Sequence, residues 1–123
     1  MGLRCGIDMI ETARVQDGVE RFGERFLNRF FTAQERLICQ DQPIRLAARL
    51  AAKEAVAKVL GTGIGDVRWI DIEIGRDERG RPVLTLHGAG AALAAELGLT
   101  QWDISLTHTR ELASAVAVAM GDF

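Results

Sequence analysis

The block AAKEAVAKVLGTGIG, residues 51–65, places the strongest constraint on how this chain folds. The helix predicted over 45–60 carries small apolar side chains on most of its surface, and such side chains let another backbone approach closely. Gly61 stands just past its last residue, where glycine commonly caps a helix. Its final turns carry three charged residues, Lys53, Glu54 and Lys58, and among so many apolar neighbours Glu54 and Lys58 are expected to emerge from a packed environment.

Composition and charge limit the class of protein. The 123 residues match one ordinary domain, and 48% are hydrophobic, so a single domain over 1–123 can bury a core. With 15 basic and 17 acidic residues, the chain lacks the basic excess of a nucleic-acid binder. Residues 12–49 nevertheless hold seven arginines against five acids, which suits an acidic partner or a phosphorylated ligand.

Cysteine and histidine usage argues against a structural zinc site. Cys5 and Cys39 form no CxxC pair, and the two histidines, His87 and His108, lie far apart in the sequence. No apolar run reaches the roughly 18 residues of a membrane span, and no basic-then-apolar leader is found. We therefore expect a soluble cytoplasmic protein with reduced thiols.

The first half of the chain reads as a strand followed by helices. Residues 3–10 predict a short strand, and from Glu11 the apolar residues step by three or four, as in a helix. Thr32 and Glu35 form a capping box that begins a further helix near Ala33. The helix after Glu11 carries four arginines, which form one stripe if it is continuous, and two glycines that can break it: Arg14, Arg21, Arg25 and Arg29, and Gly18 and Gly23.

The second half of the chain predicts mostly strands. The alternation of Ile70, Ile72 and Ile74 with acids is typical of a half-buried strand. The last segment is rich in alanine, but Val116 and Val118 alternate along it and favour a strand over a helix. The fold class is α+β, with N-terminal helices packed on a small, mostly antiparallel sheet. The remaining predicted elements are a turn over 77–82, strands over 83–88, 103–109 and 111–120, and a helix over 89–97.

Asp8 allows two interpretations. It follows a hydrophobic strand in GIDMIE, where an acid is either the N-cap of the next helix or a metal ligand. Taken alone the cap is favoured, since aspartate is a preferred N-cap and Glu11 supplies the partner of a capping box.

Three features of the second half of the helix and of the last strands are equally ambiguous. Glu54 and Lys58 can form an i, i+4 ion pair worth about 0.2–0.5 kcal/mol. Alternatively, a single acid among the three bases Arg49, Lys53 and Lys58 suits a site in which an anion such as a phosphate also binds. Gly61-Thr62-Gly63 is either a plain C-cap or a close approach to a bulky ligand, and it is not a P-loop. His108 shares a strand face with apolar residues, which favours a hydrogen-bonded core histidine.

The order and spacing of these segments resemble the small bacterial holo-acyl-carrier-protein synthases, the short one-domain type of 4′-phosphopantetheinyl transferase. The resemblance covers nearly the whole chain, and its most specific element is AAKEAVAKVLGTGIG paired with GIDMIE. The family more often has a glycine and a phenylalanine where this chain has Ala48 and Leu50. The segments that carry the resemblance are GIDMIE, RFFTAQE, RLAAKEAVAKVLGTGIG, DIEI, GRPVLTL and ISLTHT.

The resemblance implies a reaction and a site. The family transfers 4′-phosphopantetheine from coenzyme A to a serine of apo-acyl carrier protein and releases adenosine 3′,5′-bisphosphate, in the service of fatty acid synthesis. Asp8 and Glu54 would hold Mg²⁺, Lys58 would stabilise the pyrophosphate, and Glu54 or a metal-bound water would take the serine proton. The residues implied to contact coenzyme A are Arg49, Lys58, Gly61, Thr62, Gly63 and His108.

The resemblance also implies partners. The stripe of Arg14, Arg21, Arg25 and Arg29 would dock the acidic carrier protein, although a solvated helix face explains each arginine almost as well. Family members are homotrimers with the coenzyme site between subunits. Two other classes stay open: a coenzyme A-binding module without catalysis, and a structural oligomer that reuses the fold.

Overall fold

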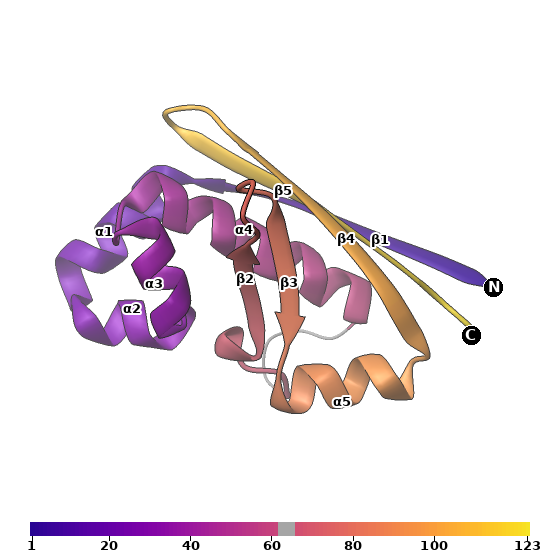
Figure 1. The fold of residues 1–123 in the computed structure, drawn as a ribbon. Coiled ribbons are helices and arrows are strands. Elements are labelled where there is room, and N and C mark those ends of the chain that lie inside the picture. Colours follow the sequence, from indigo (N-terminus) through magenta and orange to yellow (C-terminus); the bar gives the residue numbers. More distant parts are fainter. Residues whose placement is uncertain (62–65) are drawn as a thin grey trace.

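The computed structural model describes residues 1–61 and 66–123, and Figure 1 shows how its elements are arranged. Among the helices of this described part, none is both long and apolar enough to cross a membrane. In chain order the elements are β1 (Gly2–Glu11), α1 (Thr12–Phe22), α2 (Glu24–Phe30), α3 (Ala33–Cys39), α4 (Pro43–Leu60), the short 3₁₀ helix η1 (Trp69–Asp71), β2 (Ile72–Arg76), β3 (Pro82–Leu86), α5 (Gly88–Glu96), β4 (Leu99–His108) and β5 (Leu112–Gly121).

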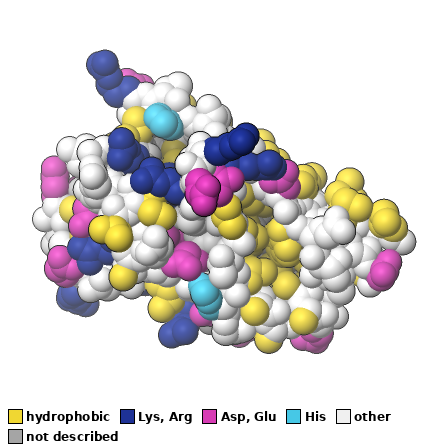
Figure 2. Space-filling view, in the orientation of Figure 1, with side chains coloured by type: hydrophobic (Ala, Val, Ile, Leu, Met, Phe, Trp, Pro, Cys, Tyr) yellow, Lys and Arg dark blue, Asp and Glu magenta, His cyan; other side chains and the backbone are white. Residues whose placement is uncertain are grey.

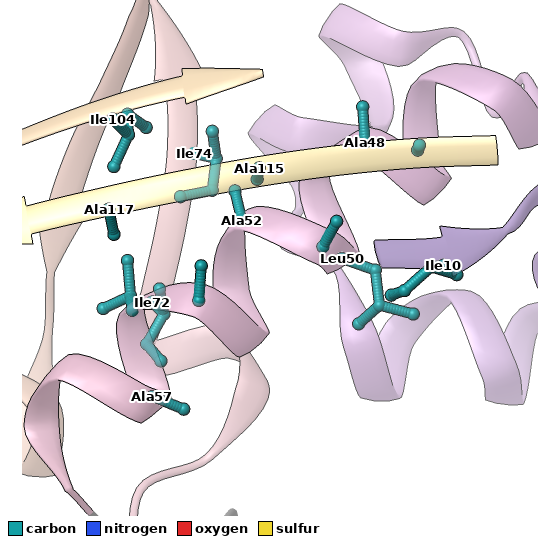
Figure 3. Close-up of a cluster of buried hydrophobic side chains, with 14 of the residues drawn as sticks. Ile10, Ala48, Leu50, Ala52, Ala57, Ile72, Ile74, Ile104, Ala115 and Ala117 are labelled. Atoms are coloured by element: carbon teal, nitrogen blue, oxygen red, sulfur yellow. The ribbon is translucent and has the colours of Figure 1, made fainter. Parts of the chain in front are cut away.

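The strands form two antiparallel sheets and α4 is the centre of the molecule. β5 lies between β1 and β4 in one sheet, and β2 pairs with β3 in a separate hairpin. Helix α4 contacts all three strands of the first sheet as well as β2, α1 and α3. In Figure 3, Ile72 and Ile74 of β2 and Ala115 and Ala117 of β5 surround the helix. The close packing expected of the 51–60 segment is confirmed.

Several local predictions are confirmed by hydrogen bonds and backbone angles. The Thr32 hydroxyl accepts from the Glu35 amide, and the Glu35 carboxylate accepts from the Thr32 amide, so the capping box is complete. Gly61 caps α4 with φ of 73°. Gly23, with φ of 55°, breaks the first helix into α1 and α2, whereas Gly18 does not. Residues 112–121 form a strand, as the valine alternation predicts.

Two predictions about the strands are wrong in detail. Ile70 lies in the 3₁₀ helix η1 and not in a strand, because the buried Asp71 carboxylate accepts from the Arg68 amide and turns the chain. The single sheet expected from the second half is instead two sheets, and β1 from the N-terminus completes the larger one.

Candidate functional site

Asp8 points at helix α4 and does not cap a helix. Strand β1 continues through Asp8 to Glu11, and α1 begins at Thr12 without a side-chain cap. The N-cap interpretation of Asp8 is therefore wrong, because the ladder with β5 holds residues 2–11 extended. The Lys58 ammonium instead donates to Asp8 Oδ1 at 3.1 Å and to the Ile7 carbonyl at 2.9 Å.

Gly6 allows this arrangement, although it is not among the site residues predicted from the sequence. A Cβ at Gly6 would lie 2.2 Å from the Ala55 carbonyl oxygen and 3.1 Å from Lys58 Cβ. The absence of a side chain lets β1 cross α4 closely, which brings Asp8 beside Glu54 and Lys58. A glycine inside a strand often marks such a close approach, so the signal was present in the sequence.

Glu54 lies beside Asp8, and the two carboxyl groups disturb each other's ionisation. Burial, a hydrogen bond with Asp8 and the charge of Asp8 raise the pKa of Glu54 to about 7. Burial also works to raise the pKa of Asp8, but hydrogen bonds with Glu54 and Lys58 outweigh it and leave that pKa below its ordinary value. Carboxylates bind a metal ion in their deprotonated form, so a cation held by this pair would displace the proton of Glu54.

The donor set fits a hard divalent cation. Asp8 Oδ2 is buried and has no hydrogen-bond partner in the described part of the chain. Side-chain exposure is 16% for Asp8, 22% for Glu54 and 58% for Lys58, so the carboxylates are recessed and the ammonium reaches toward solvent. Residues 1–61 and 66–123 contain no cluster of three or more metal-ligating side chains. Mg²⁺ is commonly held by one or two carboxylates, with water and phosphate oxygens as the other ligands.

The ion pairs around Glu54 differ from the expected i, i+4 pair. Lys58 pairs with Asp8, and Glu54 is approached by Arg14 Nη1 at 3.7 Å. The sequence placed Arg14 only in a carrier-docking stripe. The structure brings it to the carboxylate pair, because α1 packs against α4.

Lys53 does not belong to the anion-binding group that was predicted for it with Arg49 and Lys58. Its side chain is fully buried, and its ammonium lies 2.7 Å from Glu35 Oε1 and 3.0 Å from the Trp69 carbonyl oxygen. Burial lowers the pKa of Lys53, although Glu35 opposes this shift. The structure therefore separates Lys53 from Glu54, its neighbour in sequence, onto different sides of α4.

The remaining predicted ligand contacts that the structure describes lie on α4, at its C-terminal end and at the end of β4. The Arg49 Nε atom is buried without a hydrogen-bond partner among the described residues. His108 is exposed at the end of β4, so the core interpretation of this histidine is wrong. Gly61 is exposed at the end of α4. Thr62 and Gly63 lie outside the described residues.

The four arginines of the predicted stripe are all exposed but are divided between two helices. Arg14 faces Glu54, and Arg21 lies 3.9 Å from Asp17 on its own helix. Arg25 and Arg29 flank an apolar cleft of about 350 Å³ that also contains Phe22, Phe26 and Phe30. We call these five residues the Phe–Arg cleft.

The family model described as the 4′-phosphopantetheinyl transferase superfamily matches residues 4–117. This range includes Asp8 on β1 and Glu54 and Lys58 on α4.

Curated proteins resemble the chain over nearly their whole length. The holo-[acyl-carrier-protein] synthase of Herpetosiphon aurantiacus is 45% identical over 126 residues, covering 97% of this chain and 99% of the relative. The holo-[acyl-carrier-protein] synthase of Solidesulfovibrio magneticus is 47% identical over 118 residues, covering 94% and 96%.

Solved structures share the fold. The Helicobacter pylori holo-[acyl-carrier-protein] synthase in complex with coenzyme A has a TM-score of 0.86 and 32% identity, over 94% of this chain and 99% of that one. The Bacillus anthracis holo-(acyl-carrier-protein) synthase in complex with CoA (3′,5′-ADP) has a TM-score of 0.78 and 31% identity, over 97% and 96%.

Proposed function

The chain belongs to the 4′-phosphopantetheinyl transferase superfamily and, within it, to the holo-[acyl-carrier-protein] synthases, and from this premise we propose the details of its reaction. It transfers 4′-phosphopantetheine from coenzyme A to a serine of an apo-acyl carrier protein, with Mg²⁺, and releases adenosine 3′,5′-bisphosphate. The acceptor is the carrier protein of fatty acid synthesis, and the reaction takes place in the cytoplasm, which agrees with the free thiols of Cys5 and Cys39. The single domain spans 1–123. The observation that carries the proposal is the facing pair of Asp8 and Glu54 beside Lys58.

The roles follow from what displacement at phosphorus needs, which is alignment and charge neutralisation. Asp8 and Glu54 would hold Mg²⁺, which supplies charge neutralisation at the pyrophosphate when bound. Lys58 is anchored by the Ile7 carbonyl and Asp8 and still reaches toward solvent, so its ammonium can donate to a phosphate oxygen where negative charge develops.

Glu54 is the chain's own candidate for the general base. Its side chain is recessed beside Asp8 but 22% exposed, so a substrate hydroxyl can come within hydrogen-bond reach of the carboxylate. A water molecule beside the carboxylate pair is the alternative base. We further propose that the coenzyme contacts are Arg49, Lys58, Gly61, Thr62, Gly63 and His108.

Detection of adenosine 3′,5′-bisphosphate tests the reaction. Chromatography of a mixture of the protein, coenzyme A, Mg²⁺ and an apo-acyl carrier protein should show this product, and a carrier whose acceptor serine is changed to alanine should not yield it. Coenzyme A binding without product would favour the non-catalytic binding module instead, and absence of binding would favour the structural oligomer.

We expect the carrier protein to dock on the arginine-bearing surface of α1 and α2. Acyl carrier proteins are acidic, and exposed basic groups steer such partners into contact. Arg25 and Arg29 test this surface most clearly, because they lie beside the apolar Phe–Arg cleft. Reversal of Arg14 would also disturb Glu54, from which it lies 3.7 Å.

Metal binding is expected to release protons in a pH-dependent way. Below neutral pH the carboxyl of Glu54 keeps its proton, because its pKa of about 7 lies above the ordinary 4.5. That proton favours the folded, metal-free protein at low pH, and this contribution is lost as the pH rises through 7. Since a metal ion displaces the proton, Mg²⁺ should release close to one proton per chain at about pH 6 and almost none at about pH 8.5.

Calorimetric titration of Mg²⁺ in two buffers of different ionisation enthalpy measures this proton count. The Asp103→Asn variant is the control, since it removes a carboxylate away from the pair and should leave the proton count unchanged. A count that stays the same between the two pH values would contradict the shared-proton account of the carboxylate pair.

We propose that the active form is a homotrimer. The face of the larger sheet that points away from α4 carries exposed apolar side chains, with Leu3 at 69%, Ile7 at 65% and Met9 at 62% exposure. Figure 2 shows hydrophobic side chains exposed at the end of the molecule where both termini lie. Large exposed apolar patches mark interaction surfaces. Sedimentation equilibrium should give three times the 13.4 kDa of one chain, and a monomer at micromolar concentration would refute the assembly.

A further inference from the structure

Arg36 of α3 joins two helices and a turn through one guanidinium group. Its Nη1 and Nη2 donate to both carboxylate oxygens of Glu24, at 2.6 and 3.1 Å. Its Nε and Nη2 donate to both oxygens of Asp41, at 3.0 and 2.9 Å, and Nη1 also donates to Asn28 Oδ1 at 2.9 Å. Two-fold pairing at both carboxylates makes this a network with fixed geometry, unlike most exposed ion pairs.

Helix α2 needs external contacts to hold its position. It has seven residues, begins after Gly23 with φ of 55°, and has no side-chain cap at its N-terminus. A helix this short is not stable by itself. On one side Phe26 packs on α1 at Gly18, where a Cβ would lie 2.2 Å from the ring. On the other side Glu24 and Asn28, one turn apart, bind Arg36.

The residues on the Arg36 side of α2 alternate with those of the Phe–Arg cleft. Arg25 directly follows Glu24, and Arg29 directly follows Asn28. Consecutive residues of an α-helix differ by a fixed rotation about its axis, so Arg25 stands to Glu24 as Arg29 stands to Asn28. Fixing Glu24 and Asn28 against α3 therefore fixes the direction in which Arg25 and Arg29 project.

Arg36 also masks acidic charge near this surface. Hydrogen bonds and charge from Arg36 lower the pKa of Glu24. The hydrogen bond from Arg36 likewise lowers the pKa of Asp41, so both groups are ionised and neutralised by their partner. Without Arg36, the surface would lose one positive charge and expose two negative charges, which would repel an acidic protein.

We propose that Arg36 is a positioning residue for carrier-protein recognition, which holds α2 with Arg25 and Arg29 in the docking orientation and masks Glu24 and Asp41. This inference rests on the proposed function, because it takes the acidic carrier protein as the partner. Arg36 does not contact the reacting groups, so its effect is confined to carrier binding.

Binding and kinetics of Arg36→Gln test the proposal. We expect the Kd for apo-acyl carrier protein, measured by fluorescence anisotropy at low salt, to rise about tenfold, as one or two lost charge interactions imply. The KM for the carrier should rise in parallel, while kcat and the KM for coenzyme A stay within about twofold. Arg36→Lys keeps the charge but loses the planar guanidinium that pairs with two oxygens at once, so its Kd should lie between those of the wild type and Arg36→Gln.

Arg81→Gln is the matched control, since Arg81 binds Asp103 through Nη2 at 3.0 and 3.1 Å on another part of the molecule. Hydrogen exchange at residues 24–30 should accelerate in Arg36→Gln and not in Arg81→Gln. Unchanged carrier Kd in Arg36→Gln would overturn the proposal, and so would a wild type that binds no acidic carrier protein. One further outcome separates this inference from the proposed function. If the wild type binds the carrier more tightly than Arg36→Gln does but transfers no 4′-phosphopantetheine, the proposed function is wrong and this inference still holds.

Discussion

Replacing Lys53 by methionine is expected to lower the free energy of unfolding by about 3–5 kcal/mol, as removal of one partner from a buried ion pair does. The side chains of Lys53 and Glu35 are both fully buried, and 2.7 Å separates their charged atoms. Methionine fills similar space but leaves the Glu35 carboxylate without its cation. The fold then holds an uncompensated charge in its interior.

Glu35 makes this loss larger because it connects three elements. One carboxylate oxygen accepts from the Thr32 amide at the start of α3, and the other accepts from the Ile74 amide of β2 at 2.8 Å. Lys53 adds α4 to the group and also donates to the Trp69 carbonyl. The pair therefore stabilises the packing of the hairpin and α3 on the central helix.

Urea unfolding at one fixed protein concentration measures the effect, since an oligomer's stability depends on concentration. Lys58→Met is the matched control, because it makes the same substitution on the same helix at a 58% exposed side chain and should cost less than about 1 kcal/mol. The double variant Glu35→Gln, Lys53→Met should be more stable than Lys53→Met, since it removes the isolated charge. Equal costs for Lys53→Met and Lys58→Met would contradict the buried-pair account.

Asp8→Asn and Glu54→Gln are each expected to lower kcat/KM for transfer at least about a thousandfold, because several kcal/mol of charge stabilisation would be lost with the metal. Each amide keeps the size of the carboxyl group and removes its negative charge. Both carboxyl groups are partly buried, and Asp8 Oδ2 has no hydrogen-bond partner among the described residues. The described residues also contain no cluster of three or more metal-ligating side chains, so no third acid is placed to substitute for a lost carboxylate.

Stability separates this functional loss from simple unfolding. Above pH 7 both carboxyls are charged in the metal-free protein and repel each other, so Glu54→Gln should be at least as stable as the wild type at about pH 8. Asp103→Asn, on β4 beside Arg81, is a control that should leave kcat/KM within about twofold. Substantial transfer by either Asp8→Asn or Glu54→Gln, at wild-type levels of folded protein, would exclude the metal role of the pair.

Patterns with a local physical cause predicted the fold well. The Thr32–Glu35 capping box and the Gly61 cap depend on a few neighbouring residues, and the structure has both. The final strand was recognisable because Val116 and Val118 alternate with alanines that pack on α4. The division into two sheets depends on contacts between distant segments, which no local pattern contains.

The errors at the site have one common origin, which is contacts with residues far away in the sequence. Asp8 resembles an N-cap until the ladder with β5 carries the strand past it. Lys53 and Glu54 are adjacent in an almost wholly apolar helix. The local sequence therefore does not indicate that Lys53 pairs with Glu35, whereas Glu54 lies beside Asp8. Gly6 offered a signal, but its meaning required knowing that α4 crosses β1.

The most direct test of metal-dependent 4′-phosphopantetheine transfer is the intact mass of an apo-acyl carrier protein after incubation with this protein, coenzyme A and Mg²⁺. We predict a gain of roughly 340 Da, one 4′-phosphopantetheine group, which disappears with a chelator and in Asp8→Asn and Glu54→Gln. An unchanged carrier-protein mass while coenzyme A binds would contradict the proposed transfer. A mass gain that persists without the metal, or without either carboxylate, would contradict the proposed role of the Asp8–Glu54 pair.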